Sequence, residues 1–401
     1  MTDEIKRKPA NQNPWYVLMT VAGEQDFFED KLHQRNRRYW NGWAAGALSD
    51  EDKAKLITED RVPEADLAPL SDQELSEIKA ALKERLGTDE IPAPGRGIAF
   101  KGTTFEKSLV CEGFLFPTYA NFRSAAFSGY AYFQSATFSS YADFRSAAFS
   151  GDAFFLSAAF SEYANFQTAT FSSYADFRSA AFSEGVRFDN AQFNATTKFK
   201  DAKFSTSPPA YFGAELHQET DWHGIKWPDV PKDSDAARHH RYAYEQLRLL
   251  MSDQKKHGDE HFFLRMELRC KEAEGSMRRF ERIASKLFGA FADYGWSAGR
   301  PFRWLVGLCT FGAGAIYFCE DPNSLGRFMG ANPADALGLG QAIAVSLSNV
   351  FPFLSLGRFF LGEELRSLTT ASEVIAGVQL FFGPLFLFLI LLALRNRFRL
   401  G

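Results

Sequence analysis

Sixteen phenylalanines recur between Phe122 and Phe204 at spacings of five and six residues in strict alternation. Neither a helix, with a period of about 3.6 residues, nor a flat strand, with a period of two, produces this rhythm. A fixed eleven-residue repeat is typical of a solenoid, in which each unit buries its apolar face only against its neighbours. We therefore predict a mainly β solenoid over residues 98–229, and we expect no enzyme pocket inside it.

A small residue, usually Ala, stands two positions before nearly every Phe, and Ser, Thr, Gln, Asp and Arg fill the other positions. A large ring next to a small residue lets the backbone of a narrow coil turn inward without overpacking. The polar positions suit a solvated outer face. The predicted core of the β-helix is formed by Phe122, Phe127, Phe133, Phe138, Phe144, Phe149, Phe155, Phe160, Phe166, Phe171, Phe177 and Phe182.

The units Ala-Asn-Phe-Arg-Ser from Ala120 and Ala-Asp-Phe-Arg-Ser from Ala142 resemble the pentapeptide repeat family, which has Phe in the central position and Ala two before it. The resemblance implies a right-handed, four-sided parallel β-helix with five residues on each face. This chain adds a sixth residue to every second unit. One coil would then need two eleven-residue repeats, and the geometry of its corners stays open.

The best-known members of that family imitate duplex DNA, which requires a strongly acidic rod. Between Phe100 and Phe204 this chain has nine basic and nine acidic residues, and the whole chain has a net charge of −4. A rod without net charge has no long-range field that could replace a ladder of phosphates. We therefore expect no nucleic-acid partner.

No motif predicts catalysis. The stretch His257-Gly-Asp-Glu260-His261 matches the inverted zinc-protease motif, but it reads as a helix start and has no evident third ligand. The four cysteines share no metal-ligand or disulfide spacing. We therefore expect no catalytic residue, no metal, no cofactor and no enzymatic activity.

Residues 300–401 are predicted to form a membrane domain. The apolar runs 302–319 and 374–394 would reach about 27 Å and 31 Å as helices, enough to cross a bilayer. Buried helices of a soluble protein are the alternative. Arginines and lysines flank both runs on the outer sides of the pair, so the positive-inside rule places both termini in the cytoplasm. With a polar amino terminus that lacks a signal-peptide core, the chain is predicted to be a multi-pass protein of the inner (plasma) membrane, with lipid as one partner.

Between these runs, residues 336–357 are apolar, but Pro352 and Gly357 interrupt them. The uninterrupted piece, residues 336–351, is too short to span a bilayer comfortably as a third helix. We predict a re-entrant half-helix, which a membrane tolerates only where it is buried in protein or lines water. The order span, half-helix, span is similar to the two-span pore domain of tetrameric cation channels, although the potassium filter Thr-Val-Gly-Tyr-Gly is absent. The candidate pore residues are Ser346, Ser348, Asn349 and Pro352. An anchor hairpin with an interfacial helix is the alternative.

Residues 233–299 are predicted to be a helical neck whose second helix begins at an Asp259 N-cap. Apolar residues from Phe263 to Phe291 alternate three and four apart, as in a stripe that packs on a partner helix. The partner would be the preceding helix, or a second copy in an oligomeric bundle.

Residues 1–97 are predicted to be a mixed region that caps the open first coil of the solenoid. We expect a short strand at 15–21 and a helix that begins at a Ser71 capping box and ends at Gly87. The basic and aromatic run from Arg35 to Trp43 would contact nucleic acid or lipid headgroups, or fold its aromatic rings onto a neighbouring element.

Two functions fit these patterns. The first is a membrane-tethered protein-interaction scaffold, in which an unknown protein partner binds a ladder of tyrosines at multiples of eleven residues: Tyr119, Tyr130, Tyr141, Tyr163 and Tyr174. The alternative is a channel-like homo-oligomeric pore with a cytoplasmic β-helix domain.

Overall fold

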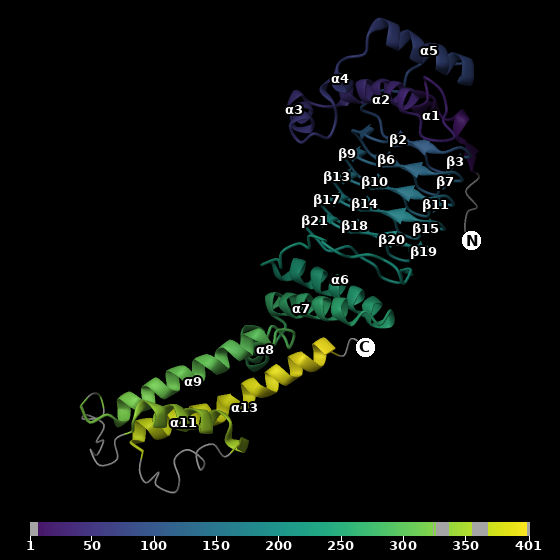
Figure 1. The fold of residues 1–401 in the computed structure, drawn as a ribbon. Helices are drawn as coiled ribbons and strands as arrows, with labels where there is room; N and C mark the ends of the chain where they lie inside the picture. Colours follow the sequence, from purple (N-terminus) through teal and green to yellow (C-terminus); the bar gives the residue numbers. More distant parts are fainter. Residues whose placement is uncertain (1–6, 324, 326–336, 355–367, 399–401) are drawn as a thin grey trace. The chain divides into compact units, whose positions relative to one another are not determined.

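A computed structural model describes residues 7–323, 325, 337–354 and 368–398. The chain divides into two compact units, residues 1–254 and 255–401, which are described here one at a time (Figure 1). Positions 336 and 355–357 of the predicted half-helix 336–357 lie outside the described residues, so the structure describes only part of this segment.

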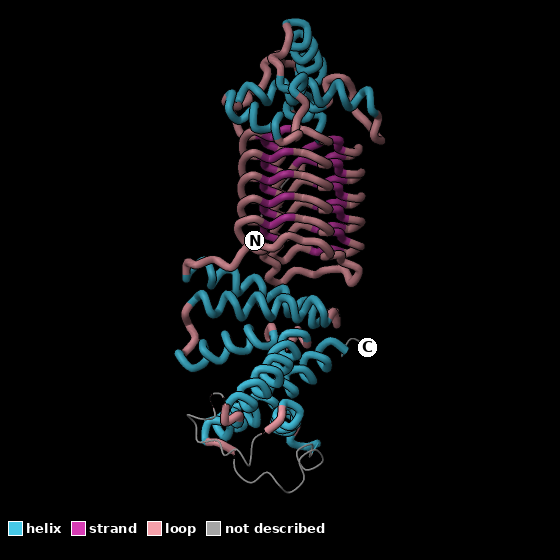
Figure 2. Tube along the Cα trace, turned by 60° about the vertical axis from the view of Figure 1, so that its left-hand side comes forward, coloured by secondary structure: helices cyan, strands magenta, loops and turns pink. Residues whose placement is uncertain are grey.

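The first unit is built on a parallel β solenoid. Twenty short strands, from β2 (Ile98–Ala99) to β21 (Lys203–Phe204), form four sheets, and each strand pairs with the strand four places further along the chain. For example, β10 (Ala142–Asp143) pairs with β14 (Ala164–Asn165) with Ala142 opposite Ala164, so one coil takes two eleven-residue repeats. Figure 2 shows the strands of successive coils stacked in columns. The sixth residue in every second unit thus leaves four distinct sheets.

Two kinds of corner explain why five and six alternate. At the tight corner the Ala125 N–H donates to the Phe122 carbonyl at 3.0 Å, and Ser124, the third residue of this turn, has φ +57°. A type II turn requires a positive φ at that place. The wide corner, as between Phe127 and Phe133, holds the additional residue. The tight-corner residues with positive φ (52–59°) are Ser124, Ser135, Ser146, Ser157, Thr168, Ser179, Asn190 and Asp201.

The phenylalanine rings fill the solenoid axis, and all twelve predicted core rings are buried. Rings one coil apart stack face to face, as Phe122 does on Phe144 with centroids 4.8 Å apart. Rings on opposite faces of the coil meet edge to face across the axis, as Phe144 and Phe155 do at 5.6 Å and 89°. Each buried ring contributes about 1.5–3 kcal/mol of transfer free energy, and each well-oriented ring pair adds roughly 0.5–1.5 kcal/mol. The aromatic column therefore stabilises this unit along its whole axis.

Helices precede the solenoid: α1 (Pro14–Met19), α2 (Asp30–Ala44), α3 (Asp50–Thr58), α4 (Glu64–Leu67) and α5 (Asp72–Leu86). The strand expected at 15–21 is wrong. Pro14 at the first helical position and the Asn13 side chain, which accepts the Trp15 N–H, start a helix there instead. The capping box at Ser71 and the left-handed Gly87 at the end of α5 are confirmed.

Helix α2 caps the first coil. The Trp40 indole N–H donates to the Leu115 carbonyl at 2.6 Å, and the Asn41 amide bonds the Gly113 carbonyl and the Leu115 N–H at 3.0 and 2.8 Å. These bonds satisfy backbone groups of β5 (Leu115–Phe116) and of the turn before it, which the open end of a solenoid would expose. Tyr39, Trp40 and Trp43 are buried, so the aromatic run folds onto a neighbouring element, as one of the alternatives predicts.

Helix α6 (Ser234–Asp253) covers the other end of the same unit. Its Tyr244 meets Trp227 edge to face at 6.0 Å, and Gln254 donates to the Leu216 carbonyl at 3.0 Å. In the last coils the pairing becomes irregular, with isolated bridges such as Arg187 to Ala210. This step is one residue longer than in the earlier coils, because the corner at 205–209 takes an additional residue.

The second unit contains α7 (His257–Glu274), α8 (Arg279–Ala292), α9 (Gly299–Glu320), α11 (Leu339–Val350) and α13 (Thr370–Phe398). The long second helix predicted for the neck is wrong, since Gly275 adopts φ +79° and separates α7 from α8. Helix α7 also begins at His257 with Lys256 as its N-cap, not at Asp259. The predicted apolar stripe is divided accordingly: Phe263 is buried in α7, whereas Phe280 in α8 is exposed.

Helices α9 and α13 are long and apolar enough to cross a membrane, by length and composition, and 28% of each apolar window is buried. They contain the predicted spans 302–319 and 374–394. The short helix α11 packs against both, and its Val350 belongs to one buried cluster with Phe386 of α13 and Leu305 of α9. A turn of 3₁₀ helix, η4 (Pro352–Leu354), follows α11.

Candidate binding pocket at the end of the solenoid

The five predicted ladder tyrosines lie on two sides of the solenoid. Tyr119, Tyr141 and Tyr163 each precede a strand of one sheet and stack on one another, with centroids 5.4 and 6.0 Å apart. Tyr130 and Tyr174 precede strands of another sheet, and Asp152 takes the place between them. Because a coil takes two repeats, positions eleven apart fall on different sheets. A single ladder of five is therefore wrong, and three tyrosines form a stack.

The tyrosine stack is fixed by a buried charge. Asp143 accepts two hydrogen bonds from the Arg145 guanidinium, at 2.8 and 2.7 Å, and one from the Tyr119 hydroxyl at 3.0 Å. Burial opposes ionisation of Asp143, but these hydrogen bonds outweigh it and lower the pKa of the carboxyl group. Burial and the nearby Asp143 charge raise the pKa of Tyr119 to about 12. This side of the solenoid thus carries an internally neutralised ion pair.

The stack ends at Tyr163 because the next position in the column is Gly185. A Cβ atom at Gly185 would lie 2.8 Å from Cε2 of Tyr163, so this position leaves no room for a further side chain. One coil later the widened corner carries Ser207 and Pro208. A glycine followed by a wider corner interrupts the regular surface and leaves a hollow beside Tyr163.

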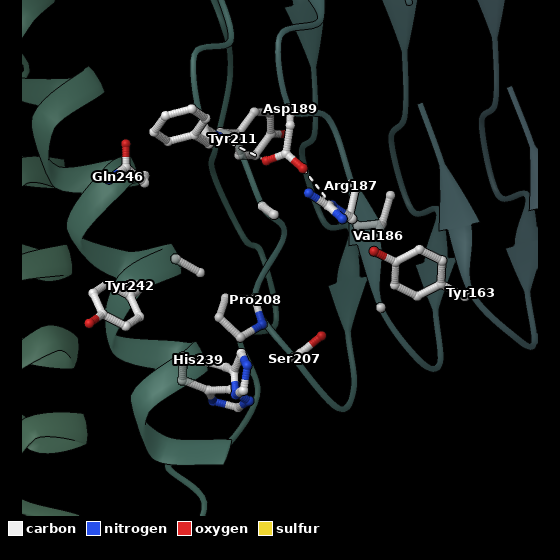
Figure 3. A pocket seen from close by; sticks show the side chains of 15 residues that line it. Tyr163, Val186, Arg187, Asp189, Ser207, Pro208, Tyr211, His239, Tyr242 and Gln246 are labelled. Atoms are coloured by element: carbon white, nitrogen blue, oxygen red, sulfur yellow. Dashed lines mark hydrogen bonds and ion pairs between the residues drawn. The ribbon is translucent and has the colours of Figure 1, made fainter. Parts of the chain in front are cut away.

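This hollow is a pocket of about 600 Å³ between the last coils and α6. Figure 3 shows Tyr163 and Val186 on the solenoid side, Tyr242 on α6, and Pro208 between them. Two large side chains among the lining residues, Phe212 and Tyr242, are 65% and 51% exposed. The pocket therefore offers aromatic and aliphatic surface to a ligand.

The two charged side chains of the pocket, Arg187 and Asp189, neutralise each other. Arg187 forms an ion pair with the buried Asp189 (dashed in Figure 3), whose carboxylate also accepts the Phe212 N–H at 3.0 Å. His240 is buried, and this burial lowers its pKa, so the imidazole is neutral at pH 7. The ion pair is internally neutralised and the buried imidazole adds no charge, so these groups suit an uncharged ligand group.

Sequence reasoning missed this pocket, although one signal for it is present. Read at one coil per step, the tyrosine column runs Tyr119, Tyr141, Tyr163 and then Gly185. The break in that column marks the pocket. The part that α6 contributes, including Tyr242, has no counterpart in the repeat and could not be placed from it.

The candidate pore residues of α11 point toward partners in the same unit. Ser346 donates to the Cys309 carbonyl of α9 at 2.8 Å, and Gln379 of α13 donates to the Ser346 hydroxyl at 2.6 Å. The Asn349 amide donates to the Gln379 carbonyl oxygen at 3.2 Å. Ser348 of the same helix is half-buried, and Pro352, which lies in η4, is exposed. The polar side of α11 is therefore used to bind α9 and α13.

The zinc-protease-like stretch forms the first turn of α7. His257 Nδ1 lies 3.2 Å from a Glu260 carboxylate oxygen, the usual distance of a local contact between residues three apart on a helix. Within residues 7–323, 325, 337–354 and 368–398, no group of three or more His, Cys, Asp and Glu side chains could hold a metal ion.

No family model, no curated protein and no solved structure matches this chain. The solenoid is thus established by its strand pairing and ring stacking. The ligand of the pocket has to be inferred from the chemistry of its walls.

Proposed function

We propose that this protein is a membrane-tethered scaffold that binds a segment of a partner protein in the pocket between the solenoid and α6, and that it has no catalytic role. The observation that carries this proposal is the apolar hollow of about 600 Å³ beside Tyr163. We also propose that the solenoid is an eleven-residue variant of the right-handed pentapeptide repeat β-helix, on the strength of its four parallel sheets.

The walls define the ligand. Apolar pockets with a few polar groups bind ligands by removing apolar surface from water, and an unpaired charge would lose its hydration there. Because Arg187 is paired with Asp189 and His240 is neutral, the pocket favours a large uncharged side chain. A Leu, Phe or Trp of the partner would lie between Tyr163 and Tyr242, and the flanking peptide would cross the rim at Phe212.

The tether is supported by the outward side chains of α9 and α13. Large apolar residues on both helices are exposed, among them Phe311 at 81% and Phe381 at 68%. In water such a surface would be an aggregation site, whereas in a bilayer it would face lipid. Basic residues stand before α9 and at the end of α13, which supports cytoplasmic placement of both termini.

The alternative of an ion-conducting pore stays a prediction. The hydrogen bonds of Ser346 and Asn349 direct these side chains into the packing of their own unit. A homo-oligomeric pore would need them to line a shared water-filled path. No contact of the described residues favours that arrangement over a scaffold.

The test is a selection from a displayed library of random peptides against the full-length protein in lipid nanodiscs. We expect the selected peptides to share one large apolar residue. The variant Ala243→Trp, which fills the pocket from α6, should weaken their binding at least tenfold. The control Leu249→Trp adds the same indole to an exposed position of α6 that is not part of the pocket lining. Peptides that bind all three proteins equally, or the absence of any selected peptide, would overturn the proposal.

A further inference from the structure

Helix α8 exposes an apolar face that α7, α9, α11 and α13 leave uncovered. Phe280, Ile283 and Leu287 are 81%, 59% and 48% exposed, and they lie on one side of the helix because they are three and four residues apart. The opposite side faces the protein: Ser285 hydrogen-bonds Glu272 of α7. This arrangement is that of an amphipathic helix held to the protein along one side only.

Basic residues border the same face. Arg279 and Lys286 are exposed, and at about 100° per residue both fall beside the stripe of Phe280, Ile283 and Leu287. Arg278 and Arg282 follow on the polar side, and Glu281 is the single acidic residue of α8. The helix therefore combines an uncovered apolar stripe with a basic margin, the combination that binds anionic membrane surfaces.

The apolar stripe continues into the surface of the candidate membrane helices. Phe291, one turn beyond Leu287 on the same side, meets Trp304 of α9 and Phe386 of α13, both edge to face at 5.4 Å. Trp304 is itself 52% exposed near the start of α9, at a level where tryptophans gather in membrane proteins. The stripe of α8 thus joins the outward apolar surface of α9 at the end where the bilayer would begin.

The corner between α8 and α9 is fixed by a charge cluster. Asp293, in a left-handed conformation with φ +50°, accepts from Arg265 of α7 at 2.6 Å and lies 3.5 Å from Arg300 of α9. Asn396 of α13 donates to the Gly295 carbonyl at 3.1 Å. Because three helices hold this corner, α8 keeps a set direction with respect to α9.

We infer that α8 lies in the membrane interface, with Phe280, Ile283 and Leu287 among the acyl chains and Arg279 and Lys286 on the headgroups of anionic phospholipids. This inference rests on the proposed membrane tether. It adds that α8 recognises the charge of the leaflet, so the neck is held against the membrane surface instead of projecting from it.

The first experiment places a photo-crosslinking amino acid at Phe280 in the full-length protein, in nanodiscs of equal parts phosphatidylglycerol and phosphatidylcholine. The control carries the same group at Glu281, an exposed neighbour outside the stripe. We expect lipid adducts at position 280 at least fivefold above those at position 281. Equal yields at both positions, or an adduct with a second copy of the chain, would overturn the inference.

The second experiment measures hydrogen exchange of α8 in phosphatidylglycerol nanodiscs and in phosphatidylcholine nanodiscs. Exchange should be at least tenfold slower in phosphatidylglycerol, and the double variant Arg279→Gln, Lys286→Gln should remove that difference. Equal exchange in both lipids would refute recognition of anionic headgroups.

Exchange in α9 and α13 separates this inference from the tether itself. Fast exchange in both helices would show that they do not span the bilayer. That result would refute both the membrane tether and the interfacial placement of α8. Slow exchange in α9 and α13 with fast exchange in α8 would overturn the interfacial helix alone. Peptide binding at the solenoid pocket is unaffected by either result and tests the scaffold separately.

Discussion

Gly185 lies against the ring of Tyr163, so closely that a Cβ atom on the glycine would be 2.8 Å from Cε2 of the ring. The tyrosine stack stops at this contact and the pocket begins. At the other end of the stack, Gly97 lies beside Tyr119 with ordinary space, since its Cβ would be 3.6 Å from the ring. The two glycines form a natural matched pair for testing the site.

Replacing Gly185 with Ala should displace the Tyr163 ring and deform the wall of the pocket. We expect the affinity for a pocket-binding peptide to fall about tenfold, which corresponds to about 1.4 kcal/mol. The control Gly97→Ala should leave binding unchanged, because its new methyl group makes only normal contacts. Isothermal titration of both variants measures the difference, and equal affinities would place the binding site elsewhere.

The aromatic column predicts a large contrast between two adjacent residues. Phe155 is buried in the axis, whereas Phe154 points outward and stacks on Tyr132 at 5.1 Å. Phe155→Ala should lower the free energy of unfolding by about 3–5 kcal/mol, because it leaves a cavity in the ring stack. Phe154→Ala should cost about 1 kcal/mol. Denaturant unfolding of the full chain in detergent compares them, and a similar loss from both would contradict the core assignment.

The tight corners predict a preference for residues that tolerate positive φ. Ser135 is exposed and has φ +52°, so Ser135→Val should destabilise the fold by about 1–2 kcal/mol through backbone strain. Ser135→Gly should be close to neutral. Ser150 is exposed at a wide corner, and Ser150→Val should change stability by less than about 0.5 kcal/mol. Unfolding midpoints of the three variants would refute the two-corner account if they coincided.

The ion pair of Asp143 and Arg145 predicts acid sensitivity of the solenoid. Because the pKa of Asp143 is lower in the folded chain, its contribution to stability is complete above the ordinary Asp pKa of about 3.9. It is lost as the pH falls through the lower folded value. The double variant Asp143→Asn, Arg145→Gln copies the Asn165 and Gln167 pair of the next coil and should fold.

Urea midpoints at pH 7 and pH 3 measure this linkage. The double variant should lose less stability between the two pH values than the wild type does. An unchanged difference would show that Asp143 does not contribute to the acid dependence.

The packing of α11 on α13 predicts a second pair of glycine variants. A Cβ at Gly383 would lie 2.7 Å from Cα of Val350, so Gly383→Ala should push the helices apart and lower the melting temperature in detergent. Gly377 on the same helix has open space around it, and Gly377→Ala should be neutral. If both variants melted like the wild type, α11 would not be packed as described.

The repeat carried most of the information about the first unit. Phenylalanines at alternating spacings of five and six residues, each with a small residue two positions before it, are enough to place the ring column. Such large side chains are buried along the axis of the coil. The positions of the tyrosines could not be read in the same way. They depend on the number of repeats in one coil, which strand pairing such as Ala142 with Ala164 reveals.

The second unit was less accessible from the sequence. The length of the apolar runs predicted α9 and α13. The three-and-four spacing of apolar residues, in contrast, placed Phe263 and Phe280 in one predicted helix. Gly275 adopts a left-handed conformation and divides that helix, so the two residues have different surroundings. Heptad spacing predicts which residues share one face of a helix, but it does not predict which other element packs on that face.

The most direct test of the scaffold is photo-crosslinking in living cells from position 242 of the full-length protein. We predict a protein adduct from Tyr242 at least tenfold stronger than one from the control position Leu249, and we predict that Ala243→Trp abolishes it. Equal adducts from both positions, or none from Tyr242, would contradict the account that this pocket binds a partner.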